Sequence, residues 1–111
     1  MNNIKNDNYF IQKIIESIDF IINNTKDIEY EQFVNDDVIT SAICFHFIQL
    51  SENVSRLSDS FVIEHQDVEW CKIKGLRNRI VHDYGNVQLD RLFVTIKNDL
   101  PELYNQLEKL I

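Results

Sequence analysis

The sequence contains few residues that bend or break a helix. Its 111 residues include two Gly and one Pro, which excludes collagen-like and low-complexity classes and argues against a turn-rich β architecture. With 44% apolar and 26% charged residues, the chain has the composition of an ordinary globular protein. At this length we expect one compact domain over residues 1–111 rather than a catalytic domain joined to a regulatory one.

Cysteines and long apolar runs are also scarce. Cys44 and Cys71 are too few for a disulfide framework and lie in no CxxC or Cys/His pattern with zinc-ligand spacing, so we interpret both as reduced core thiols. No apolar run approaches the roughly 20 residues that span a bilayer, and the amino terminus lacks the basic start and apolar stretch of a secretory signal. We therefore expect a cytoplasmic protein that does not contact a membrane.

Apolar residues recur at helical spacing in four long segments, which predicts an all-α, up-and-down bundle of four to five helices. The expected elements are a helix over 9–24, a helical turn over 29–34, a helix from an Asn35 cap to about Leu57, a helix after an Asp67 cap, and a last helix from about Gln88. Residues 58–66 are polar and aperiodic, which is typical of a loop. Gly85 and Asn86 should end the fourth element, and Pro101 should bend or break the last helix.

The helix expected up to Leu57 is apolar in nearly every direction around its axis. A surface helix of a globular protein keeps one polar face in water, which this segment lacks. We therefore interpret it either as the central helix of the bundle or as a helix shared between two subunits.

Positive charge is in the minority, with 11 basic against 18 acidic side chains and a net charge of -7. Such a balance opposes indiscriminate binding to a nucleic-acid backbone. One segment of eight positions without a carboxylate nevertheless carries four of the basic residues, namely Lys72, Lys74, Arg77 and Arg79. A polyanion would have to bind at this local basic site.

Arg77 lies within the apolar stripe of its predicted helix, where a guanidinium needs a carboxylate or an incoming anion such as phosphate. The structural alternative is a pair with Glu52, the one charge set among apolar positions on the central helix. Asn78 and His82 are four residues apart on the edge of the same helix as Arg77. A histidine beside an arginine can move protons to and from a phosphate ester.

The other two histidines carry no comparable signal. We interpret His46, in the apolar helix, as a hydrogen-bonded core residue and His65 as a solvated loop residue. None of the three histidines has a second histidine or a cysteine three or four residues away, so no metal site is expected.

The stretch from Gly75 to Tyr84, which reads GLRNRIVHDY, resembles the signature of HepT-like ribonucleases in the HEPN superfamily. That signature is Arg, four to six residues, then His, with Tyr two residues further on. The combination of Arg-Asn with His-x-Tyr is more specific than Arg-x4-His alone. Two surrounding features agree: Trp70 precedes the Arg, and the preceding long helix carries Glu52. The family often has Gly directly before that Glu, where this chain has Ser51.

The resemblance implies an RNase toxin that needs no metal or cofactor and acts as a homodimer, with its two motifs facing each other across a cleft. In this interpretation Arg77 holds the scissile phosphate of the RNA, supported by Glu52. His82 is the acid/base, and Asn78 orients either the histidine or the ribose. The residues that would steer the RNA backbone are Lys72, Lys74 and Arg79.

The resemblance also implies a protein partner, a minimal nucleotidyltransferase antitoxin of the MntA type. Tyr84 matches the tyrosine that such an antitoxin modifies with AMP, although a structural tyrosine could also pack its ring over the helix end. Two alternatives stay open. The chain could be a non-catalytic helical partner of a nucleotidyltransferase, which its acidic charge favours, or an inactive descendant that keeps Arg77 and Glu52 as a buried pair.

Overall fold

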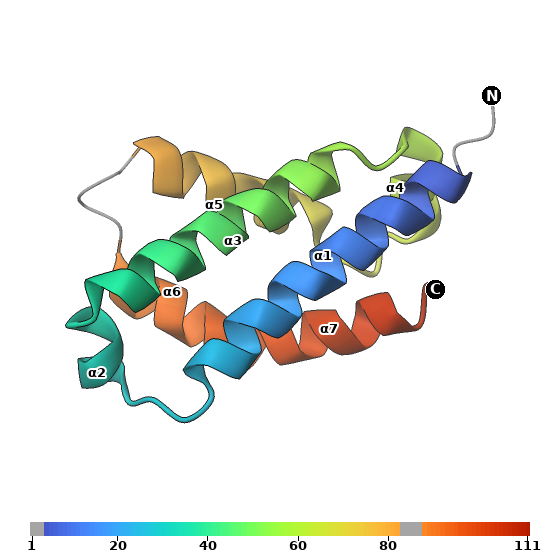
Figure 1. Cartoon of the computed structure of the whole chain (residues 1–111). Coiled ribbons are helices and arrows are strands. Elements are labelled where there is room, and N and C mark those ends of the chain that lie inside the picture. Colours follow the sequence, from blue (N-terminus) through green and yellow to red (C-terminus); the bar gives the residue numbers. More distant parts are fainter. Residues whose placement is uncertain (1–3, 83–87) are drawn as a thin grey trace.

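The computed structural model describes residues 4–82 and 88–111, and within these ranges the chain is helical without any strand (Figure 1). The all-α prediction is therefore confirmed. Three long helices are α1 (Ile4–Thr25), α3 (Asp37–Ser55) and α5 (Trp70–His82). A fourth rod is formed by α6 (Leu89–Val94), the π-helical segment η1 (Thr95–Asp99) and α7 (Leu100–Glu108), which follow one another directly. Two short helices, α2 (Tyr30–Val34) and α4 (Asp59–Glu64), complete the fold.

The helix α3 lies at the centre of the bundle, packed against α1 on one side and α5 on the other, while α7 packs on α1 (Figure 1). The core consists of apolar side chains that follow one another at helical spacing, such as Ile11, Ile14, Ile18 and Ile21 of α1 and Ile43, Phe47, Leu50 and Val54 of α3. Close packing of this kind does not join α5 to α7. A groove lies between α5 and the last rod.

The start of α3 differs from the prediction by one residue. Asp36, and not Asn35, caps the helix, because the Asp36 carboxylate accepts a hydrogen bond from the Ile39 N–H at 3.0 Å. Asn35 instead ends α2, and its side-chain amide donates to the Glu31 carbonyl. A carboxylate at this position also suits the positive end of the helix dipole.

The expected loop over residues 58–66 is wrong, because α4 forms there. Ser58 caps α4 by accepting a hydrogen bond from the Phe61 N–H at 3.2 Å. The buried carboxylate of Asp7, on α1, accepts hydrogen bonds from the Ser58 N–H at 2.8 Å and from its hydroxyl at 2.6 Å. The next helix, α5, begins at Trp70 rather than directly after Asp67.

Pro101 is predicted to bend or break the last helix. The α-helix is interrupted by η1 in the turn before Pro101, while the rod stays helical. A proline lacks an N–H, and its ring crowds the carbonyl four residues before it. The wider turn of η1 directly precedes the first turn of α7, which contains Pro101, and so accommodates the ring. Lys97 of η1 donates to the Thr25 carbonyl at 2.6 Å and thereby fastens the wide turn to the end of α1.

The remaining predictions on helix ends have separate outcomes. The last rod begins where predicted, with Gln88 as the N-cap of α6. The expected terminator at Gly85 and Asn86 lies outside the described residues. None of the helices in the two described ranges combines the length and the apolar character that crossing a membrane requires.

Candidate functional site

The helix α5 carries the predicted motif and is anchored at its first residue, Trp70. The Trp70 ring is buried, and its Nε1 donates to the His65 carbonyl at 2.9 Å. Ile73 and Ile80 are buried on the same stripe and hold α5 against α3. The apolar spacing of this segment thus orients the helix on the bundle as the sequence predicts.

Ser51 connects the two helices one turn before Arg77. Its side chain is buried, and its hydroxyl donates to the Ile73 carbonyl at 2.7 Å. In an α-helix this carbonyl is also the acceptor for the N–H four residues later, which belongs to Arg77. The sequence identified Ser51 only as a departure from a common glycine, because its partner lies 22 residues away.

Arg77 and Glu52 form an ion pair between α5 and α3, in which the Arg77 Nε donates to a Glu52 carboxylate oxygen. The pair is not buried: the two side chains are 44% and 37% exposed. The expectation that the guanidinium is buried within the apolar stripe is therefore wrong. A pair this exposed holds the guanidinium in place and leaves it accessible to an anion from solvent.

Lys74 and Asn78 are exposed on α5 on either side of Arg77 in the sequence. His82 is the last residue of α5, four residues after Asn78, so the two positions lie one turn apart on the same face. The side chain of His82 and the whole of Tyr84 lie outside the part of the chain that the structure describes.

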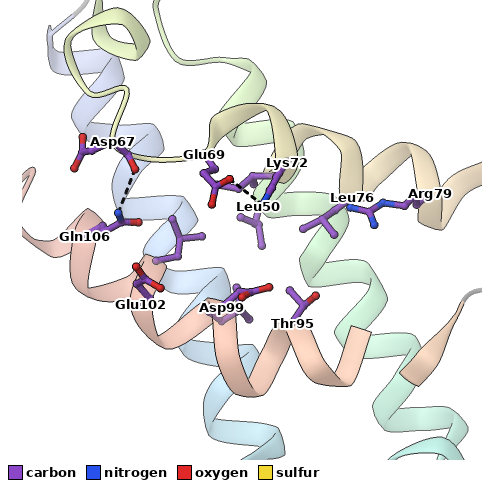
Figure 2. A pocket seen from close by; sticks show the side chains of 13 residues that line it. Leu50, Asp67, Glu69, Lys72, Leu76, Arg79, Thr95, Asp99, Glu102 and Gln106 are labelled. Carbon is purple, nitrogen blue, oxygen red and sulfur yellow. Dashed lines mark hydrogen bonds and ion pairs between the residues drawn. The ribbon is translucent and has the colours of Figure 1, made fainter. Parts of the chain in front are cut away.

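The predicted RNA-steering residues do not lie on one face of α5. Lys72 pairs with Glu69 at 2.8 Å, an interaction that raises the pKa of the lysine. Together with Arg79, Lys72 lines a groove between α5 and the last rod (Figure 2). At about 100 degrees per residue, both lie on the opposite side of α5 from Lys74. Only Lys74 of the three is therefore close to Arg77 on the helix surface.

His46 differs from its prediction as a hydrogen-bonded core residue. Its ring stacks on Phe20 of α1 with 3.8 Å between the ring centroids, and its buried Nδ1 has no hydrogen-bond partner among the described residues. Partial burial lowers the pKa of His46 from its ordinary value of 6.5. His65 lies outside the helices, in the turn after α4, as predicted. It is half-buried rather than solvated, with its ring centroid 4.5 Å from that of Phe61.

The two cysteines lie in different surroundings. Cys44 is half-buried, and burial raises the pKa of its thiol. Cys71 is exposed on α5, because its position points away from the stripe that packs on α3, and its prediction as a core thiol is wrong. Within residues 4–82 and 88–111, no group of three or more His, Cys, Asp or Glu side chains is arranged to hold a metal ion.

Comparisons with known proteins point to one class of enzyme. A family model described as "Ribonuclease HepT-like" matches residues 14–110. The chain is 30% identical to a "Putative RNase" of Caldanaerobacter subterraneus subsp. tengcongensis, over 92% of this chain and 91% of that protein. It is 27% identical to a "Probable ribonuclease HepT" of Thermococcus cleftensis, over 91% of this chain and 92% of that one. No solved structure matches the chain.

Proposed function

Because the chain belongs to the HepT-like ribonuclease family, we propose that it is an endoribonuclease toxin whose reaction is centred on Arg77 and His82. Its substrate is RNA, which it cleaves by internal transesterification without a metal ion. Asn78 orients the histidine or the ribose, and Glu52 positions the guanidinium of Arg77.

The observation that carries this proposal is the exposed Glu52–Arg77 pair. An exposed ion pair stabilises a fold by only about 0–1 kcal/mol, and this pair is more than a third exposed on both sides, so stability alone does not account for it. The carboxylate restricts the rotamers of Arg77 and so reduces the entropy lost when the guanidinium meets a phosphate. The pair therefore supports a role in holding the scissile phosphate.

The chemistry requires two proton transfers and positive charge. A base removes the proton of the ribose 2′-hydroxyl, and the 2′-oxygen then attacks phosphorus. The bond from phosphorus to the 5′-oxygen breaks as an acid protonates the 5′-oxygen. The products are a 2′,3′-cyclic phosphate and a 5′-hydroxyl end. Arg77 stabilises the additional negative charge on the phosphoryl oxygens of the five-coordinate transition state. One His82 supplies one of the two proton transfers, so a second copy of the chain is needed for the other.

A homodimer is supported by an apolar strip on the outer face of α3. Val38 is 79% exposed and Phe45, two turns further along, is 56% exposed. Glu52 follows after another two turns, so the strip leads directly to the Glu52–Arg77 pair. Large apolar side chains that follow one line on a surface are typical of a protein interface. A two-fold axis at this strip would bring the two α5 motifs close to one cleft.

The test is cleavage of total cellular RNA by the purified protein in EDTA, compared with His82→Ala and with His65→Ala as the matched control. We expect cleavage by the wild type and by His65→Ala, loss of cleavage in His82→Ala, and the same dimer in all three by analytical ultracentrifugation. Cleavage that survives His82→Ala would refute the acid/base role. A folded dimer without any cleavage would favour a non-catalytic partner of a nucleotidyltransferase.

The proposal includes control by a partner antitoxin of the nucleotidyltransferase type, which transfers AMP to Tyr84. Added phosphate charge and bulk two residues from His82 would oppose the phosphate of the substrate. Mass spectrometry after incubation with the antitoxin and ATP should detect one or more AMP additions in the wild type and none in Tyr84→Phe. An unchanged wild-type mass, or an addition that persists in Tyr84→Phe, would contradict this part.

A further inference from the structure

A groove runs along the side of α5 that faces away from Lys74, where α5 and the last rod do not pack closely (Figure 2). It encloses about 420 Å³, a volume within the range of pockets that bind ligands. Its floor is apolar and comes from three rods, with Leu50 of α3, Ile73 and Leu76 of α5, and Leu100 and Leu103 of α7. A smaller hollow that shares Leu76 and Arg79 extends it toward α6.

The charged side chains around this groove are separated by sign. Asp99 and Glu102 line it along η1 and α7, and Asp67 lies at the end where Gln106 donates to the Asp67 carbonyl at 3.3 Å. Arg79 lies where the groove continues into the extension toward α6, and Arg91 lines the extension itself. The one internal ion pair of the groove, between Glu69 and Lys72, contributes no net charge (Figure 2).

These features select among possible occupants. Asp67, Asp99 and Glu102 form no ion pair within the groove, unlike Glu69, which pairs with Lys72. Their carboxylates would repel a nucleic-acid backbone. Two copies of this groove placed face to face offer no ridge that could fill either one. A helix of another protein fits better, because the open side of a helical bundle accepts a helix whose apolar side chains lie between the flanking rods.

We propose that this groove binds an amphipathic helix of a partner protein. Apolar residues one and two turns apart on that helix contact Leu76 and the rest of the floor. Its basic end lies over Asp99 and Glu102, and its acidic end lies over Arg79 and Arg91. The groove and the motif occupy different sides of α5, so this proposal does not rest on ribonuclease activity.

The test uses a synthetic, fluorescein-labelled helical peptide of about four turns, with leucines on one face, lysines at one end and glutamates at the other. A control peptide has the same composition, with the leucines distributed around the helix. We expect fluorescence anisotropy to detect binding of the first peptide and not of the second. Amide shifts in a nuclear magnetic resonance titration should map to α5 and α7. Equal binding of both peptides, or shifts confined to other helices, would refute the proposal.

Charge reversal tests the predicted orientation. Asp99→Lys/Glu102→Lys should weaken binding of the peptide at least about tenfold, because its basic end would then meet lysines. A tenfold change in affinity corresponds to about 1.4 kcal/mol. The matched control is Asp90→Lys/Glu108→Lys, which changes two exposed carboxylates on the same rod outside the groove. It should leave the affinity within about twofold. Leu76→Ala provides an uncharged variant that removes part of the floor and should also weaken binding.

The same variants test whether RNA or a second copy of the chain, rather than a partner helix, occupies the groove. Both double variants change the net charge equally, so any general effect on attraction to RNA is shared. We expect equal RNA cleavage and equal oligomeric state in both. A change in RNA cleavage confined to Asp99→Lys/Glu102→Lys would identify RNA as the occupant, and a change in oligomeric state confined to it would identify a second copy. Either outcome would overturn the proposal of a partner helix.

Discussion

At the scale of single residues, the exposure of the Glu52–Arg77 pair leads to a prediction that separates folding from function. Exposed ion pairs stabilise a protein by about 0–1 kcal/mol, whereas breaking a buried pair costs about 3–5 kcal/mol. Because both side chains are more than a third exposed, Arg77→Ala should lower the free energy of unfolding by no more than about 1 kcal/mol. RNA cleavage should be lost.

Urea denaturation and RNA cleavage measured on the same samples check this prediction. Arg91→Ala, which changes an exposed arginine on α6, is the control and should retain cleavage. A loss of about 3 kcal/mol or more in Arg77→Ala would instead support the hypothesis of an inactive descendant in which the pair serves the fold.

His46 is the residue for which a pH dependence follows from its surroundings. Its pKa is lowered by burial, so below about pH 6.5 the unfolded chain takes up a proton more readily than the folded one. The stability that depends on neutral His46 is therefore lost as the pH falls below that value. His46→Phe keeps a ring to stack on Phe20 and removes the titration.

Thermal unfolding at several pH values between about 7.5 and 5.5 checks this sign. The wild type should lose melting temperature toward acid faster than His46→Phe, since the carboxylates titrate alike in both proteins. Parallel pH profiles of the two proteins would show that His46 does not contribute.

At the scale of helices, Gly75 lies in the interior of α5, and no neighbouring side chain in the described part of the chain explains why a glycine stands there. A Cβ built on Gly75 meets nothing within 4 Å. Alanine is favoured over glycine in a helix by about 0.8–1 kcal/mol. Gly75→Ala should therefore stabilise the chain by about that amount and raise its melting temperature by several degrees. Calorimetry gives the measurement. If stability falls or the oligomer weakens, another molecule lies within reach of this position.

The last rod shows that a helix-breaking residue acts through its tertiary surroundings. Pro101 by itself predicts an interruption, but the chain passes through η1 and stays helical. Lys97 of that segment is bonded to the end of α1, 72 residues away in the sequence. Such a contact stabilises the wide turn and has no signature in the local pattern.

At the scale of the whole molecule, the apolar strip on α3 predicts the oligomeric state. Phe45 is 56% exposed, so Phe45→Lys should cost the single chain little stability while it places a charge in the proposed interface. Ile63→Lys, at a 66% exposed position on α4, is the matched control. We expect ultracentrifugation to detect monomers for Phe45→Lys and dimers for Ile63→Lys. Dimers of both variants would exclude Phe45 from the interface.

Properties that depend on neighbours along the chain were determined by the sequence alone. The isoleucine spacing predicts α1, the leucine spacing predicts the last rod, and Arg77, Asn78 and His82 share one helix because they fall within six positions. Helical periodicity and capping involve residues three or four positions apart, so they are visible in a single sequence.

Only the tertiary structure decided how these elements meet. Three contacts join residues far apart in the sequence: the exposed Glu52–Arg77 pair, the Ser51 hydrogen bond to Ile73, and the bond from Ser58 at the start of α4 to Asp7. Their sequence separations are 25, 22 and 51 positions. The groove likewise exists because α5 and α7, each packed on a different helix, leave a space between them. Contacts over such separations depend on how whole helices pack, which periodicity along one helix does not specify.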